Sequence, residues 1–90
     1  MAVRTKYTDP DFRRNPKTKL FCYQCQKDLV PDSPYRMVYV VDGMSALHPD
    51  DVPGYVKGKN DIGWLPIGSD CARRLGLEWS ITKEAYDARH

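Results

Sequence analysis

The sequence predicts a small α+β domain, and three features support this fold class. A C-x2-C pair, Cys22 and Cys25, follows a short apolar segment and indicates a tight turn that carries both thiols. Residues 35–48 hold an alternating β-branched and aromatic segment, an Asp-Gly pair and a second apolar segment, which is the pattern of a β-hairpin. Residues 68–76 begin with Gly-Ser-Asp, which can open and cap a helix, and end with a glycine, which can terminate one.

The first 19 residues are expected to form a basic, flexible arm, and residues 20–90 a single folded domain. Residues 1–20 contain six basic and two acidic side chains, whereas the rest of the chain contains eight basic and ten acidic ones. The arm has two prolines and few apolar residues, a composition that does not support a packed segment. Basic character is therefore concentrated in the arm, and the domain is mildly acidic.

The hairpin is the clearest element of the pattern. Tyr35–Val41 is rich in aromatic and β-branched residues, and every second residue, Tyr35, Met37, Tyr39 and Val41, falls on one face, which predicts a strand. The pair Asp42-Gly43 suits a type I′ turn, since both central residues of that turn need a positive φ. Residues 44–48 are then the returning strand, which Pro49 ends because proline cannot donate to a β-ladder.

The second half of the domain is expected to contain a long polar loop and two helices. Residues 49–63 lack a periodic apolar pattern and predict the loop. A short helix over 71–75 is expected next, capped by Ser69 or Asp70 and ended by a glycine. A second helix is expected from about Thr82, which would be its cap. The side chains predicted to pack these helices into the core are Leu75, Leu77, Trp79 and Tyr86.

Four residues have the donor types of a closed tetrahedral zinc site, namely Cys22, Cys25, His48 and Cys71. Three cysteines cannot all pair within one chain, which favours a metal over disulfides. The first turn of a helix also eases a thiol toward thiolate, so the place of Cys71 suits zinc binding. The sequence therefore predicts a bound Zn²⁺. Other candidates for the fourth ligand are Asp50, Asp51, Asp70, His90 and a water.

The order of turn, hairpin and helix resembles a treble-clef zinc finger over roughly residues 20–76. In that family a C-x2-C knuckle and the first turn of a helix share one ion across a β-hairpin. The chain departs from the family pattern in two ways. Only Cys71 is available on the helix, where the family has two ligands, and Gln26 stands where many knuckles have glycine. The resemblance implies a zinc-stabilised domain that binds nucleic acid or protein.

Two other interpretations of the cysteines remain open. All three can be small core residues, or Cys22 and Cys25 can form a redox pair, although that pair usually lies at a helix N-terminus in a βαβ unit. The chain shows no H-E-x-x-H, H-x-E or phosphate-binding loop motif. We therefore expect a binding module rather than an enzyme.

The basic arm suggests nucleic acid as the partner. The residues expected to contact it are Arg13, Arg14, Lys17, Lys19, Arg73 and Arg74. The alternative is an adaptor or inhibitor that binds a larger enzyme or protein assembly. The N-terminus has no apolar signal segment and no apolar run is long enough to span a membrane, so a cytoplasmic monomer is expected.

Overall fold

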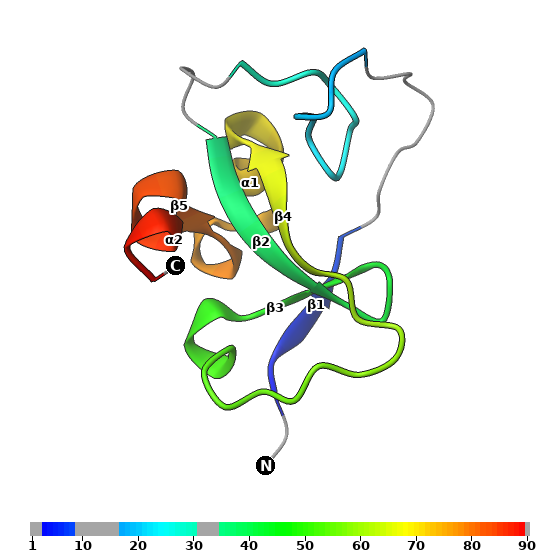
Figure 1. Ribbon diagram of the computed structural model, residues 1–90, viewed down its shortest axis with the longest axis vertical. Coiled ribbons are helices and arrows are strands. Elements are labelled where there is room, and N and C mark those ends of the chain that lie inside the picture. Colours follow the sequence, from blue (N-terminus) through cyan, green and yellow to red (C-terminus); the bar gives the residue numbers. More distant parts are fainter. Residues whose placement is uncertain (1–2, 9–16, 31–34, 90) are drawn as a thin grey trace.

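A computed structural model describes residues 3–8, 17–30 and 35–89, which form an antiparallel sheet with two short helices (Figure 1). The strands are β1 (Thr5–Tyr7), β2 (Tyr35–Val41), β3 (Ser45–Leu47), β4 (Gly63–Gly68) and β5 (Ile81–Thr82). The helices are α1 (Ser69–Leu75) and α2 (Lys83–Arg89), with 3-10 turns η1 (Pro49–Asp51) and η2 (Leu77–Trp79). The predicted mixture of helices and antiparallel strands is confirmed. Neither α-helix has the length or the apolar character needed to cross a membrane.

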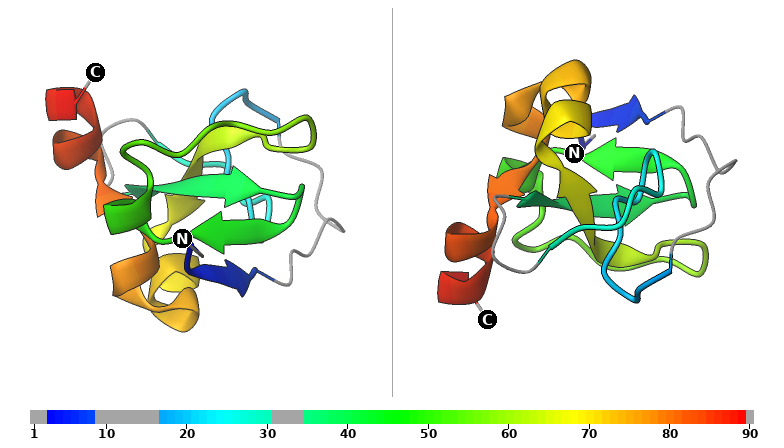
Figure 2. Two further views of the ribbon diagram at one scale, coloured as in Figure 1. Left: turned by 90° about the horizontal axis from the view of Figure 1, so that it is seen from below. Right: turned by 90° about the horizontal axis from the view of Figure 1, so that it is seen from above.

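Strand β2 is the centre of the sheet, whose order is β1-β3-β2-β4 (Figure 2). Strand β4 pairs with one edge of β2 along nearly its whole length. The other edge is shared, since β3 pairs with its C-terminal half and β5 with Arg36 and Met37. Strands β3 and β4 are therefore separated by β2, which decides where the residues that follow each of them lie.

The predicted hairpin is confirmed, and Asp42 and Gly43 adopt the expected positive φ angles, 52° and 81°. The connection contains three residues, Asp42, Gly43 and Met44, whereas the expected type I′ hairpin turn has two. Val41 pairs with Ser45 across the turn, and the returning strand ends one residue before His48. Asp61 ties the following polar loop back to this turn, because its carboxylate accepts a hydrogen bond from the Asp42 N–H at 2.9 Å.

Part of the expected arm differs from its prediction. Residues Thr5–Tyr7 form the edge strand β1, antiparallel to β3, and Thr8 is buried beside them. The pairing is continued at both ends by hydrogen bonds from Thr8 N to Met44 O and from His48 N to Arg4 O, each 3.0 Å long. An edge strand is held by backbone bonds and needs no apolar face, so its exposed side chains give no sequence signal. Residues 9–16 of the arm lie outside the described residues.

The sheet has a packed cluster on each face, because alternate residues of β2 point in opposite directions. One face packs against α1 and the cysteine-bearing turn, and its buried residues are Cys22, Tyr23, Val38, Val40, Ala46, Ile67, Cys71, Ala72 and Leu75. The other face packs against α2 through Tyr35, Met37 and Ile81, with Trp64 and Tyr86 beside them. Cys22 and Cys71 therefore belong to the larger core, and the partly buried Cys25 packs against it.

The helix ends differ from the predictions in detail. Helix α1 begins at Ser69 and its N-cap is Gly68, which offers no side chain, so the expected cap at Ser69 or Asp70 is wrong. Helix α2 is capped as predicted, since Ala85 N donates to Thr82 Oγ1 at 3.1 Å. Leu77 is 51% exposed and is not a core residue. Gly76, with a φ of 112°, ends α1 and turns the chain, so the helical spacing does not continue to Leu77.

Candidate metal centre

The structure brings three cysteine thiols together. The Sγ atoms of Cys22, Cys25 and Cys71 all lie within 4.8 Å of one another, and no disulfide joins them. We call these three residues the thiol cluster. Within residues 3–8, 17–30 and 35–89 it is the one group of three or more potential metal ligands that converges in this way. A metal-binding site is therefore available at this point of the fold.

The first two thiols are presented by a tight turn over residues 20–29, which we call the knuckle. The two sides of this turn are joined by hydrogen bonds from Cys22 N to Lys27 O at 2.8 Å and from Leu29 N to Leu20 O at 2.9 Å. Gln26 N donates to Cys22 O at 2.8 Å and closes the turn. Gln26 has a φ of 61°, so it adopts the left-handed conformation that glycine takes most readily. Gln26, which stands where many treble-clef knuckles have glycine, therefore adopts the backbone conformation that glycine favours.

The third thiol comes from the first turn of α1, against which the knuckle packs. Tyr23 N donates to Pro66 O of β4 at 2.8 Å, which fixes the knuckle beside the strand that leads into the helix. A Cβ placed on Gly68, the N-cap of α1, would lie 3.7 Å from the Cys22 Sγ. Cys71, two residues beyond Ser69, consequently lies opposite the two thiols of the knuckle.

The electrostatics of the thiol cluster favour a bound cation. Burial raises the pKa of the Cys71 thiol to about 12, with further contributions from hydrogen bonding to Cys25 and from the charge of Cys22. Cys22 and Cys71 are 0% and 4% exposed, so their thiolates would be poorly hydrated. A divalent metal ion supplies the compensating charge, and soft thiolates suit Zn²⁺. The chemistry of the donor set therefore fits zinc.

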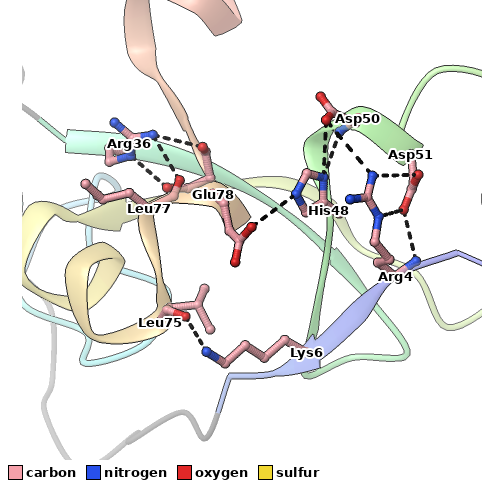
Figure 3. Close-up of polar contacts among 10 residues, drawn as sticks. Arg4, Lys6, Arg36, His48, Asp50, Asp51, Leu75, Leu77 and Glu78 are labelled. Carbon is pink, nitrogen blue, oxygen red and sulfur yellow. Dashed lines mark hydrogen bonds and ion pairs between the residues drawn. The ribbon is translucent and has the colours of Figure 1, made fainter.

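His48, the predicted fourth ligand, does not join the thiol cluster. Its Nδ1 accepts a hydrogen bond from Asp50 N at 3.2 Å, and its Nε2 lies 3.8 Å from a Glu78 carboxylate oxygen (Figure 3). Its ring also makes an edge contact with Trp79. The reason is the strand order. His48 follows β3, Cys71 follows β4, and the width of β2 separates those strands, about 10 Å across two spacings.

The other candidates for a fourth ligand have partners of their own. Asp51 accepts hydrogen bonds from the backbone and side chain of Arg4 at 2.9 and 3.1 Å, and Asp50 lies 4.0 Å from the same guanidinium. Asp70, adjacent to Cys71, pairs with Arg73. That guanidinium, followed by the charges of nearby basic residues, lowers the pKa of Asp70. His90 lies outside the described residues.

Four of the six predicted nucleic-acid contacts can be placed. Lys17 and Lys19 are exposed beside the knuckle, and Arg73 and Arg74 are exposed on α1. Arg13 and Arg14 lie outside the described residues. The basic residues that can be placed therefore form two exposed groups, one directly before the knuckle in the chain and one on α1.

Sequence reasoning missed three basic residues, of which Lys27 lies on the knuckle, Lys6 contacts α1 and Arg4 binds the turn η1. Lys27 is exposed on the knuckle, and its charge contributes to lowering the pKa of Asp70. Lys6 Nζ donates to Leu75 O at the end of α1, and Arg4 binds Asp51. The partners of Lys6 and Arg4 lie far along the chain, so no local pattern in the sequence predicts these contacts.

Comparison of the chain with models of protein families, with curated proteins and with solved structures finds no significant match. The function of the chain is therefore inferred from its own geometry and chemistry.

Proposed function

We propose that this chain is a treble-clef-like zinc-binding domain in which the ion has a structural role. The observation that carries the proposal is the convergence of the three Sγ atoms within 4.8 Å. Zinc held by Cys22, Cys25 and Cys71 would cross-link the knuckle to α1. Structural zinc contributes roughly 10–16 kcal/mol of apparent binding free energy in zinc-finger peptides, and small domains often depend on such a cross-link.

Metal content and metal-dependent folding test this proposal. Protein purified under reducing conditions is expected to hold one zinc ion per chain by native mass spectrometry with elemental analysis. A chelator should remove the ion and abolish the near-ultraviolet circular dichroism of the packed aromatic residues. Cys71→Ser should lower zinc affinity by at least tenfold, whereas Met44→Ser, at an exposed position, should not change it. A folded protein that binds no zinc would contradict the proposal.

We further propose that the domain is an interaction module that contacts nucleic-acid phosphates. Support comes from four exposed basic residues, Lys17 and Lys19 next to the knuckle in the chain and Arg73 and Arg74 on α1. Such contacts release condensed counterions, so the logarithm of the affinity for duplex DNA should fall with the logarithm of salt by about 0.9 per phosphate contacted.

A matched pair of double variants tests the nucleic-acid proposal. Replacing Lys17 and Lys19 by alanine should weaken binding to random-sequence DNA or RNA and reduce the salt slope by about two contacts. Replacing the exposed loop residues Lys57 and Lys59 by alanine changes the net charge equally and should leave the slope unaltered. Equal effects of the two pairs would mean that binding depends only on net charge.

A protein-binding adaptor is the second candidate function. It is favoured by exposed apolar side chains at the β1 edge, where Tyr7 is 61% and Met44 43% exposed and the two are in contact. Exposed aromatic residues of this kind are enriched in protein interfaces. Co-purification of a partner that resists high salt and is lost in Tyr7→Ser would support this function over the first.

A further inference from the structure

Among the residues that the structure describes, the thiol cluster offers fewer donors than zinc requires. Zinc in structural sites is almost always bound by four ligands, and the described part of the chain brings three together. His48 is held by Asp50 and faces Glu78 on the far side of β2. Asp70 is paired with Arg73. The fourth donor is therefore missing from among the side chains whose positions are described.

The three thiols differ in their access to solvent. Cys22 and Cys71 are buried, whereas Cys25, at the tip of the knuckle, is only partly buried. The side of the thiol cluster at Cys25 is therefore the side from which a molecule in solution can approach.

The charges around the thiol cluster favour an anionic donor. Three thiolates outweigh the charge of one Zn²⁺ by a single negative unit, and Asp70 adds another. Arg73 pairs with Asp70, and Lys27 on the knuckle and Arg74 on α1 are exposed basic residues on the two segments that carry the thiols. These three cations exceed the two negative units by one, so one further anion brings the surroundings to neutrality. A thiolate matches both this charge and the softness of the donors already present.

We propose that the metal centre takes its fourth ligand from outside the chain and that this ligand is a thiolate. The proposal rests on the proposed zinc-binding function. In the binding step the sulfur of an external thiol donates an electron pair to the ion, and its proton passes to the solvent. No atom is oxidised or reduced. The thiol is supplied either by a small molecule or by a cysteine of a partner protein.

Cobalt substitution of the full chain tests the proposal. Co²⁺ replaces Zn²⁺ in thiolate sites and shows a sulfur-to-metal charge-transfer absorption whose intensity follows the number of thiolates. We expect the metal-loaded chain to bind 2-mercaptoethanol, the probe, with saturation at one equivalent and a gain of about one third in that absorption, from three thiolates to four. His48→Ala should behave like the unaltered chain.

A charge variant tests whether the basic residues near Asp70 assist thiol binding. Replacing both Lys27 and Arg74 by alanine should raise the half-saturating thiol concentration roughly threefold or more, because two exposed cations are lost from the knuckle and α1. Replacing Lys57 and Lys59 by alanine is the matched control and should leave that concentration unchanged. Equal shifts in both variants would overturn the electrostatic part of the proposal.

Failure of the inference can be distinguished from failure of the proposed function. Absence of any charge-transfer absorption with Co²⁺ would overturn zinc binding itself. Absorption that appears with the metal but does not respond to the thiol would overturn the external ligand. In that case His48→Ala, Asp70→Ala and His90→Ala would identify the internal donor.

Native mass spectrometry of the zinc-loaded chain purified from cells identifies the source of the thiol. An adduct with the mass of a small thiol supports the first source. A protein complex that excess 2-mercaptoethanol dissociates supports the second. A zinc-loaded chain that carries neither and does not take up 2-mercaptoethanol overturns the proposal.

Discussion

The side-chain nitrogen of Lys6 lies 2.5 Å from the carbonyl oxygen of Leu75 and donates a hydrogen bond to it (Figure 3). This contact joins β1 to the C-terminal end of α1, where the helix dipole favours a positive charge. Because α1 also provides Cys71, the edge strand helps to hold the helix that carries the third thiol. A segment whose sequence suggests a free arm therefore supports the candidate metal centre.

Lys6→Met keeps the aliphatic part of the side chain and removes its charge and its donor. We expect the free energy of unfolding to fall by about 1 kcal/mol, the usual value for one charge-assisted bond at a helix end. Urea denaturation at a fixed free zinc concentration measures the change. Lys59→Met, in the exposed loop, is the control and should change the free energy of unfolding by much less. Equal losses in the two variants would show that the Lys6 contact adds nothing to stability.

Gln26 is expected to cost stability through its backbone, since its φ is 61°. Gln26→Gly should be more stable than Gln26→Ala by about 1 kcal/mol, because glycine adopts this conformation without the clash of a Cβ. Comparing glycine with alanine removes the contribution of the glutamine side chain from the measurement. Thermal unfolding at constant zinc provides the readout. An alanine variant as stable as the glycine variant would disprove strain at this position.

The stability of the metal-free protein should fall at high pH. The pKa of the Cys71 thiol is raised from its ordinary value of 9.0 to about 12 in the folded chain, chiefly by burial. A group with a raised pKa stabilises the fold below pH 9, and this contribution is lost as the pH rises toward 12. Bound zinc gives stability the opposite pH dependence. Zinc binds deprotonated sulfurs, so its contribution to stability is lost as the pH falls and the thiols are protonated. Unfolding curves from pH 7 to 11, with and without zinc, should therefore change in opposite directions. Parallel curves would contradict the placement of Cys71 in the centre.

Tyr55 should ionise later than an exposed tyrosine. Its hydroxyl donates to the Asp61 carboxylate at 2.6 Å, and this bond raises the pKa of the phenol to about 12. Ultraviolet absorbance titration of the six tyrosines should show a late ionisation that belongs to Tyr55. In Asp61→Asn this ionisation should move to lower pH, because the charged acceptor is removed. The contribution of this bond to stability is lost as the pH rises through the raised pKa. Asp87→Asn, on the exposed face of α2, should leave the titration unchanged.

The elements that the sequence predicts well are those with local causes. The Asp42-Gly43 turn and the Thr82 cap each depend on a few consecutive residues, and both are present in the structure. Strand β1 escapes prediction because its stabilisation comes from backbone pairing with β3, about forty residues away, and its side chains are exposed. Local patterns therefore predict turns and caps, whereas edge strands depend on partners that the pattern does not contain.

The same distinction applies to the candidate site. The spacing of the cysteines indicates that Cys22 and Cys25 share a turn, and a short helix is expected around Cys71. Whether His48 reaches them depends on the order of strands in the sheet, which spacing along the chain does not reveal. The insertion of β2 between β3 and β4 directs His48 toward Glu78 instead. Donor type can be predicted from sequence, but donor position requires the topology.

The separation of the thiols along the chain also has a consequence for synthesis. Cys22 and Cys25 leave the ribosome together, and Cys71 follows only after most of the sheet has been made. An ion that meets the growing chain early finds two sulfurs and remains exchangeable with the metal buffers of the cell. Only docking of α1 adds the third sulfur. Metal selection in this protein would then take place only after α1 has been synthesised, when the nascent polypeptide closes on whichever ion it holds.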